Sequence, residues 1–219
     1  MSSLIDAASR RSVSSAQNFP LLSGMGIAAF RVDPAVLIHV ATHSGLPVIH
    51  KRFGRFGKAP LMLACEVGAD RRIIEILIEA GGDVGAKDSF FGQTALHWAV
   101  YWRRLEAVEV FLSRGSEING KSDDGWTPLH LAAMSYPEWT DGVKELMKHS
   151  ALEINARSND GQTPLHLACS QGHLPTVNIL LGHNGIDANV VNNDGDTPLH
   201  VAVQERDYKL VSLLLNQVS

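Results

Sequence analysis

The chain has 219 residues, 45% of them apolar, and its 19 lysines and arginines nearly balance 23 aspartates and glutamates for a net charge of −4. This balance argues against a nucleic-acid or polybasic membrane protein, whose affinity comes from clustered positive charge. No apolar run approaches the ~20 residues that cross a bilayer, and the first residues lack the apolar core of a signal peptide. Two cysteines, Cys65 and Cys169, favour a reducing compartment, so we expect a cytoplasmic or nuclear protein.

Residues 1–33 form an N-terminal extension that differs from the rest of the chain. Its first half, "SSLIDAASRRSVSSAQN", is polar and rich in serine, which predicts partial disorder. The run "FPLLSGMGIAAF" follows and is apolar but broken by glycines. It could fold over the first helices as a cover.

One phrase then recurs along the chain, as "FGQTALHWAV", "DGWTPLHLAA", "DGQTPLHLAC" and "DGDTPLHVAV", with a weaker copy "FGKAPLMLAC" before them. The residues at its threonine position are separated by 35, 33, 36 and 34 positions, and they are Ala59, Thr94, Thr127, Thr163 and Thr197. This pattern resembles the ankyrin repeat, whose period is ~33 residues. The resemblance covers the chain from about Phe53 onward.

Each unit also predicts its own local structure. Asp-Gly before the phrase is typical of a tight turn, threonine can cap a helix, and proline suits its first turn. A second helix with a dense apolar face follows, as in "RRIIEILIEAG", and it can be buried only if neighbouring units stack. We therefore expect an all-α solenoid of helix-turn-helix units with projecting β-hairpin loops over residues 57–219, with repeats starting near 57, 92, 125, 161 and 195.

The two ends of this array depart from the pattern. "VLIHVATHSG" repeats the first helix with His39 in the phrase position, only 23 residues before Met62, so residues 34–56 are expected to form a shortened capping helix pair. At the other end, "LLLNQVS" offers no polar capping face. We expect further repeats or another domain to pack on this last helix.

The phrase histidines, His97, His130, His166 and His200, raise the question of metal binding or catalysis. The resemblance implies instead that they tie hairpins to helices by hydrogen bonds. Packed helices lie ~8–10 Å apart, whereas two histidines on one zinc have nitrogens within ~4 Å. Cys65 and Cys169 are expected to be buried and inert. We expect no catalytic residue, no metal and no cofactor.

The resemblance places partner binding on the concave surface made by the hairpin tips and the exposed sides of the first helices. Aromatic residues gather in the middle of that surface and polar or acidic ones follow. Some aromatics could be core instead: Trp98 could pack inside, and Phe90 and Phe91 could pack on each other. We favour an aromatic binding patch. The expected partner-binding residues are Phe90, Phe91, Tyr101, Trp102, Asp123, Asp124, Trp126, Met134, Ser135, Tyr136, Trp139, Asn159, Asp160 and Gln162.

The sequence therefore predicts a non-catalytic scaffold or adaptor that binds a partner protein, without nucleic-acid binding or membrane insertion. Two alternatives remain open. The chain could be the substrate-targeting arm of a larger enzyme such as a ubiquitin ligase or a kinase, or it could inhibit a transcription factor. The resemblance also raises asparagine hydroxylation at Asn119, Asn155 or Asn189, against the simpler expectation that these side chains satisfy turn backbone.

Overall fold

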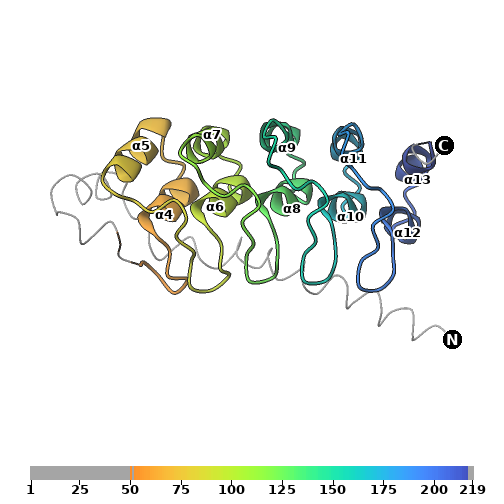
Figure 1. The fold of residues 1–219 in the computed structure, drawn as a ribbon, viewed down its shortest axis with the longest axis horizontal. Helices are drawn as coiled ribbons and strands as arrows, with labels where there is room; N and C mark the ends of the chain where they lie inside the picture. The colour runs from red at the N-terminus through yellow and green to blue at the C-terminus, as the bar shows by residue number, and fades with distance from the viewer. Residues whose placement is uncertain (1–49, 51, 217–219) are drawn as a thin grey trace.

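Five helix pairs follow one another in a single row in the computed structural model, which describes residue 50 and residues 52–216 (Figure 1). The expectations for residues 1–33, and for most of 34–56, lie outside these residues. The first helices of the pairs form one layer, which we call the inner helices: α4 (Pro60–Val67), α6 (Ala95–Tyr101), α8 (Pro128–Ala133), α10 (Pro164–Ser170) and α12 (Pro198–Gln204). The second helices form the outer layer: α5 (Arg71–Glu79), α7 (Leu105–Ser113), α9 (Thr140–Met147), α11 (Leu174–Leu181) and α13 (Tyr208–Leu215).

The expected all-α solenoid is confirmed, since the described residues form these ten helices and no strand. The loops that precede the inner helices project to one side of the row (Figure 1). They carry only isolated bridges, Phe53 to Lys58 and Lys87 to Thr94, rather than paired strands. Each expected repeat start lies three residues before an inner helix.

The recurring phrase sets where each inner helix begins. Thr127, Thr163 and Thr197 hold extended backbone as the residue before the helix, and the proline that follows each has no amide proton to leave unpaired. The turn before the helix requires a left-handed residue, which Gly125 supplies with a φ of 76° and Gly161 with 74°. The six residues from the turn glycine to the phrase histidine, such as 125–130, therefore specify both the end of the loop and the start of the inner helix.

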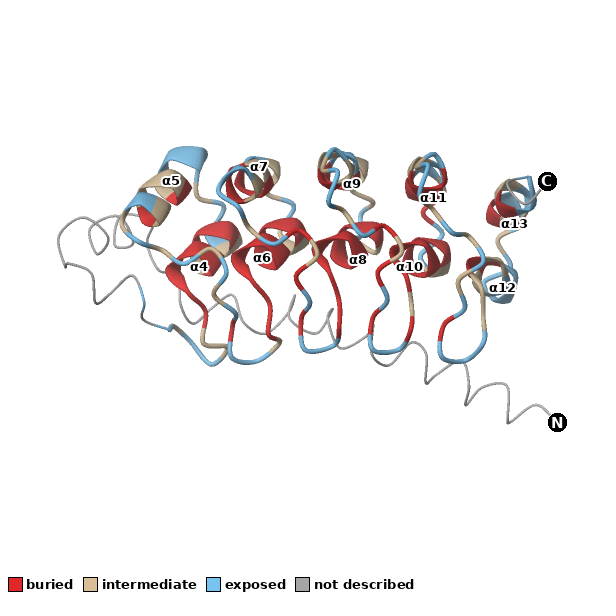
Figure 2. Cartoon of the chain, viewed as in Figure 1, coloured by how far each residue is buried: buried red, intermediate tan, exposed pale blue. Residues whose placement is uncertain are grey.

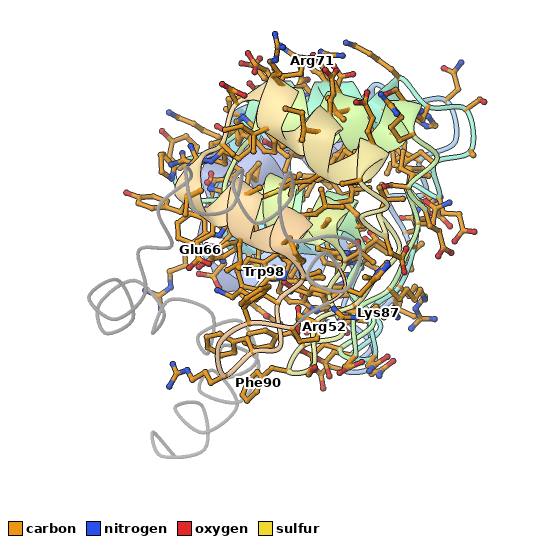
Figure 3. All side chains as sticks on the ribbon, turned by 90° about the vertical axis from the view of Figure 1, so that its left-hand side faces the viewer. Arg52, Glu66, Arg71, Lys87, Phe90 and Trp98 are labelled. Carbon is orange, nitrogen blue, oxygen red and sulfur yellow. The ribbon has the colours of Figure 1, made fainter. Side chains whose placement is uncertain are left out.

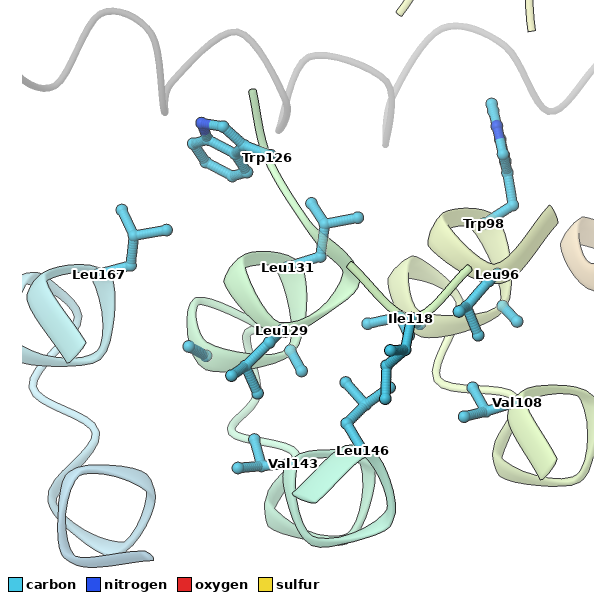
Figure 4. Close-up of a cluster of buried hydrophobic side chains, with 14 of the residues drawn as sticks. Leu96, Trp98, Val108, Ile118, Trp126, Leu129, Leu131, Val143, Leu146 and Leu167 are labelled. Atoms are coloured by element: carbon cyan, nitrogen blue, oxygen red, sulfur yellow. The ribbon is translucent and has the colours of Figure 1, made fainter. Parts of the chain in front are cut away.

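The core lies between the two helix layers and between neighbouring pairs (Figures 2 and 4). Leu96, Leu129 and Leu165 occupy one position of the phrase and are fully buried, and Val108 and Val143 meet them from the outer helices. Burying one such side chain contributes about 1.5–3 kcal/mol relative to exposure. Stacking is therefore what makes each small pair stable.

The loop between α8 and α9 is longer than its counterparts and is held on both sides. Arg103 Nη1 donates to the Pro137 carbonyl at 3.4 Å, and Glu138 Oε1 accepts from Thr176 N at 2.7 Å and Thr176 Oγ1 at 2.6 Å. α8 has six residues, one fewer than α6, and ends at Ala133, before Pro137. The insertion is thus a fixed part of the row.

The last pair has the most exposed apolar side chains at one end of the row. Val203 is 55% exposed, Tyr208 73% and Leu215 51%. This is consistent with the expectation that something packs there, which stays a prediction. None of the described helices is long and apolar enough to cross a membrane.

Candidate functional site

The phrase histidines join each repeat to the next. In all four of them Nδ1 accepts from the backbone N–H of the threonine three residues earlier, at 3.1–3.3 Å, and in His97, His130 and His166 the proton therefore sits on Nε2. That Nε2–H donates to a backbone carbonyl just before the next inner helix, at 3.0 Å in each case. The pairs are His97 with Trp126, His130 with Gln162, and His166 with Asp196.

Burial keeps these histidines neutral. Desolvation lowers the pKa of His97 to about 4 and that of His130 to about 4, and it also lowers the pKa of His166. Both ring nitrogens are occupied by scaffold bonds. A group arranged in this way is poorly placed to shuttle protons or bind a metal at neutral pH.

His200 differs from its three counterparts. It keeps the contact between Nδ1 and Thr197 Oγ1 at 2.8 Å, but its side chain is exposed, and no carbonyl among residues 50 and 52–216 meets its Nε2.

The two thiols and the remaining possible metal ligands are equally poor candidates for chemistry. Burial raises the pKa of Cys65, and burial together with Asp207 raises that of Cys169 to about 12. Both thiols are free and fully buried. In the part of the chain that the structure describes, no three histidine, cysteine or acidic side chains gather into a metal-binding group.

The tips of the projecting loops carry different side chains in successive repeats. We call their tips the hairpin face, defined by Phe90, Phe91, Asp123, Asp124, Asn159, Asp160, Asn193 and Asp194. Figure 3 shows Phe90 at the far edge of the loops, on the opposite side of the molecule from Arg71 of α5. The hairpin face therefore lies away from the outer helices.

Three phenylalanines cluster at the start of the hairpin face. The ring centroids of Phe90 and Phe91 lie 4.7 Å apart, edge to face, and Phe56 of the preceding loop lies 5.3 Å from Phe90 and 5.9 Å from Phe91. The Arg55 guanidinium covers Phe56 at 4.7 Å. Phe90 nevertheless remains 60% exposed, so the mutual packing expected of Phe90 and Phe91 is present and still leaves an aromatic surface.

A buried polar network fixes this cluster from below. Asp88 accepts from the backbone N–H of Phe90 and Phe91 through Oδ1, at 2.9 and 2.6 Å, and from Trp98 Nε1 through Oδ2 at 3.0 Å. Lys58 is 7% exposed, lies 4.3 Å from the Trp98 ring and pairs with Glu66 at 2.7 Å. Sequence reasoning missed the role of Lys58 and Asp88, because nothing in the sequence brings them beside Trp98.

A second group of aromatic residues lies at or after the C-terminal ends of the inner helices α6 and α8, and we call it the loop edge: Tyr101, Trp102, Tyr136 and Trp139. Tyr101 lies 5.3 Å from Trp102 and 6.4 Å from Trp98. Tyr136 is 88% exposed, whereas the other three are half-buried. The Trp139 ring lies so close to Gly142 that an added Cβ there would be 2.1 Å from it.

Trp126 requires a correction. The sequence places it among the exposed partner-binding residues, but its side chain is only 7% exposed and belongs to the buried cluster. Its ring stacks near His130 at 6.4 Å, and Figure 4 shows it beside Leu131. Trp98 is 4% exposed, as the alternative reading of that residue anticipated.

The later part of the hairpin face is polar. Asp123, Asp124, Asn159 and Asp160 are exposed, and Asn159 Nδ2 donates to the Asp123 carbonyl at 2.8 Å, so adjacent tips are tied together. The other expected contact residues, Gln162, Met134 and Ser135, are half-buried, and the Ser135 hydroxyl donates to the Leu131 carbonyl at 2.9 Å.

Two of the three asparagines raised as hydroxylation sites, Asn119 and Asn155, hold neighbouring repeats together. Asn119 donates to the Ala151 carbonyl at 2.7 Å and accepts from Glu153 N at 2.9 Å. Asn155 makes the equivalent bonds to Gly185 and Asp187, at 2.7 and 3.0 Å. These contacts match the expectation that the amides satisfy backbone.

The sequence matches the family described as ankyrin repeats (3 copies), over residues 28–122, 61–157, 116–192 and 140–219. It is 29% identical over 134 residues to an ankyrin repeat protein of fowlpox virus, which covers 56% of this chain and 39% of the relative. It is 32% identical over 125 residues to an E3 ubiquitin-protein ligase of Arabidopsis thaliana, covering 46% of this chain and 27% of that protein. It is also 41% identical over 83 residues to human NF-kappa-B inhibitor zeta, covering 36% of this chain and 12% of the relative. The chain spans less than two fifths of the length of each.

Proposed function

Since this chain belongs to the ankyrin-repeat family, whose fold is a non-catalytic interaction fold, we propose that it is a scaffold or adaptor that binds a partner protein through the hairpin face and the loop edge. The observation that carries the proposal is a contrast between positions. Where repeats stack, successive units use the same threonine, leucine and histidine, whereas their exposed tips change from phenylalanine to aspartate and asparagine.

The exposed aromatics supply the affinity in this proposal. Tyr136 is 88% exposed and Phe90 60%, although the backbone N–H of Phe90 donates to Asp88 and the carbonyl of Pro137, next to Tyr136, accepts from Arg103. Rigid aromatic side chains lose little entropy on binding and are common among interface hot spots. The acidic tips then set orientation and association rate more than affinity.

Two narrower roles are compatible with this surface. Matches to E3 ubiquitin-protein ligases, over 27% and 4% of their lengths, support a substrate-targeting arm, and the match to NF-kappa-B inhibitor zeta supports inhibition of a transcription factor. The two roles differ in what the partner does when bound: modification of the partner favours the first, and loss of DNA binding by the partner favours the second.

The proposal includes a protein partner rather than nucleic acid, because the net charge is −4 and the tips of the later loops are acidic. It also includes a reducing location, the cytoplasm or the nucleus, which the two free buried thiols support.

The experiment is a comparative affinity capture with the full chain as bait. Phe90→Ser with Tyr136→Ser removes the two most exposed candidate aromatic side chains, and Glu79→Ser is the control, since the Glu79 side chain is 67% exposed on the outer helix α5, away from both surfaces. We expect proteins retained by the wild type and by the control to be lost with the double variant. Equal retention by all three contradicts the proposal.

A further inference from the structure

The charge of the loop row changes sign along the array. The first loop carries Arg52 and Arg55, both exposed. The tips of the last two loops carry Asp160 and Asp194, exposed, with Asp196 half-buried beside them, while Arg157 of the same loop as Asp160 is exposed and donates to Asn193 Oδ1 at 3.4 Å. The lysines between them point along the row, Lys87 to the Lys121 carbonyl at 2.7 Å and Lys121 to the Arg157 carbonyl at 2.9 Å. A ligand that is apolar at one end and basic at the other matches this row in one direction only.

Residues 1–33 have that composition. The run 19–30, "FPLLSGMGIAAF", contains no charge, and Arg10 and Arg11 precede it in a serine-rich stretch. Phe19 lies eight positions after Arg11, or about 26 Å in extended chain. Packed helices lie ~8–10 Å apart, so the tip of Asp160 is about 20 Å from the phenylalanine cluster and that of Asp194 about 30 Å. The spacing of the two features in the segment therefore fits the spacing of their complements on the row.

The first described loop lies beside the phenylalanine cluster, which is where a segment bound there would have to rejoin the array. Arg52 and Phe53 start the first loop, and its Phe56 already contacts Phe90 and Phe91. Arg52 lies 22 positions after Phe30, and the first loop is one repeat spacing, about 10 Å, from the loop that carries Phe90. The segment can thus return to the neighbouring loop without strain.

We propose that residues 1–33 bind the hairpin face of their own array, with residues 19–30 on the phenylalanine cluster and Arg10 and Arg11 between the tips of Asp160 and Asp194. The segment then runs opposite to the order of the repeats. This occupant regulates the surface of the proposed function, and that consequence rests on the proposed function. A tethered segment acts at an effective concentration of about 1 mM. If the Kd of the segment for the hairpin face is tenfold below this effective concentration, the face is unoccupied in about a tenth of the molecules. The apparent affinity of a partner for the face then falls about tenfold.

The contact can be tested without a partner by a spin label on the full chain. Ser12→Cys places one accessible thiol beside Arg11, while Cys65 and Cys169 are fully buried. We expect a nitroxide there to broaden the amide signals of the loops that carry Asp160 and Asp194, and to leave the loop 53–58 unaffected. Absence of broadening, or broadening confined to the first loop, overturns the proposal. Broadening in isotope-labelled chains mixed with spin-labelled unlabelled chains identifies a second copy as the occupant, which also overturns it.

Charge exchange supplies the control. Asp160→Lys with Asp194→Lys should abolish the broadening, and Arg10→Glu with Arg11→Glu in the same chain should restore it. Failure of the restoration contradicts the assigned register. Leu21→Ser with Leu22→Ser should also abolish the broadening and should tighten binding of a captured partner about tenfold. A chain that shows the intramolecular broadening but binds its partner equally with and without these two changes contradicts the proposed function, not the contact.

Discussion

Replacing His130 by alanine tests the scaffold role of the recurring histidine. The change removes the bond from Nε2 to the Gln162 carbonyl at 3.0 Å and the bond from Thr127 N to Nδ1 at 3.1 Å. Each net hydrogen bond contributes about 1 kcal/mol, and a buried group left unpaired costs about 1–3 kcal/mol. We expect the free energy of unfolding to fall by at least about 2 kcal/mol. At about 2–4 °C per kcal/mol for a chain of this size, the melting temperature should fall by about 4–8 °C.

His200→Ala is the matched control, because His200 keeps the contact with its own threonine but lacks the bond to a following loop. Its loss should cost less than about 1 kcal/mol. The assay is urea unfolding of both variants beside the wild type, with amide exchange to locate the change, since stability in stacked repeats is largely local. Equal losses for the two variants would refute the reasoning, because they would show that the inter-repeat bond contributes nothing.

Three further outcomes are expected. Acidification from pH 7 to 5 should lower the free energy of unfolding by about 2 kcal/mol for each of His97 and His130. Their pKa values fall from 6.5 in the unfolded chain to about 4 in the folded one, so the unfolded chain binds more protons in this window. Urea titrations at both pH values should show the loss, and His97→Gln with His130→Gln should remove most of this dependence of stability on pH. Trp126→Ala should lower the free energy of unfolding by about 3–5 kcal/mol in a denaturant titration. A decrease of no more than about 0.5 kcal/mol would show that the Trp126 side chain is not part of the core. The backbone amides of α13 should exchange fastest among those of the five outer helices, because α13 keeps more of its apolar surface exposed. Uniform protection of all outer helices in the isolated monomer would contradict this.

Much of the fold could be predicted from the sequence because one phrase encodes several neighbouring requirements. The turn glycine, the capping threonine, the helix-starting proline and the bridging histidine occupy six consecutive positions, so their joint recurrence specifies a unit. Even the weak copy follows the rule: Met62 replaces the histidine, and its sulfur accepts from Ala59 N at 3.3 Å.

The candidate surface could be predicted less well, because exposure is not a property of one position in a repeat. Trp126 lies on a loop, where exposure was expected, yet its ring turns into the stack and is 7% exposed. Lys58 belongs to a basic stretch but lies buried on Trp98 and beside Glu66, 40 and 8 residues further along the chain. Such contacts depend on how adjacent repeats meet, which the sequence of one repeat does not encode.

The central claim, that the exposed aromatics of the hairpin face and the loop edge bind a partner protein, is tested most directly by calorimetric titration of the captured partner into the full chain. Each of Phe90→Ser and Tyr136→Ser should weaken binding by about 2 kcal/mol, or about thirtyfold in Kd, if the residue is a hot spot. Glu79→Ser should leave Kd unchanged, and melting curves of all three variants should match the wild type within about 0.5 kcal/mol of stability. An unchanged Kd for both aromatic variants with intact folding would contradict the account.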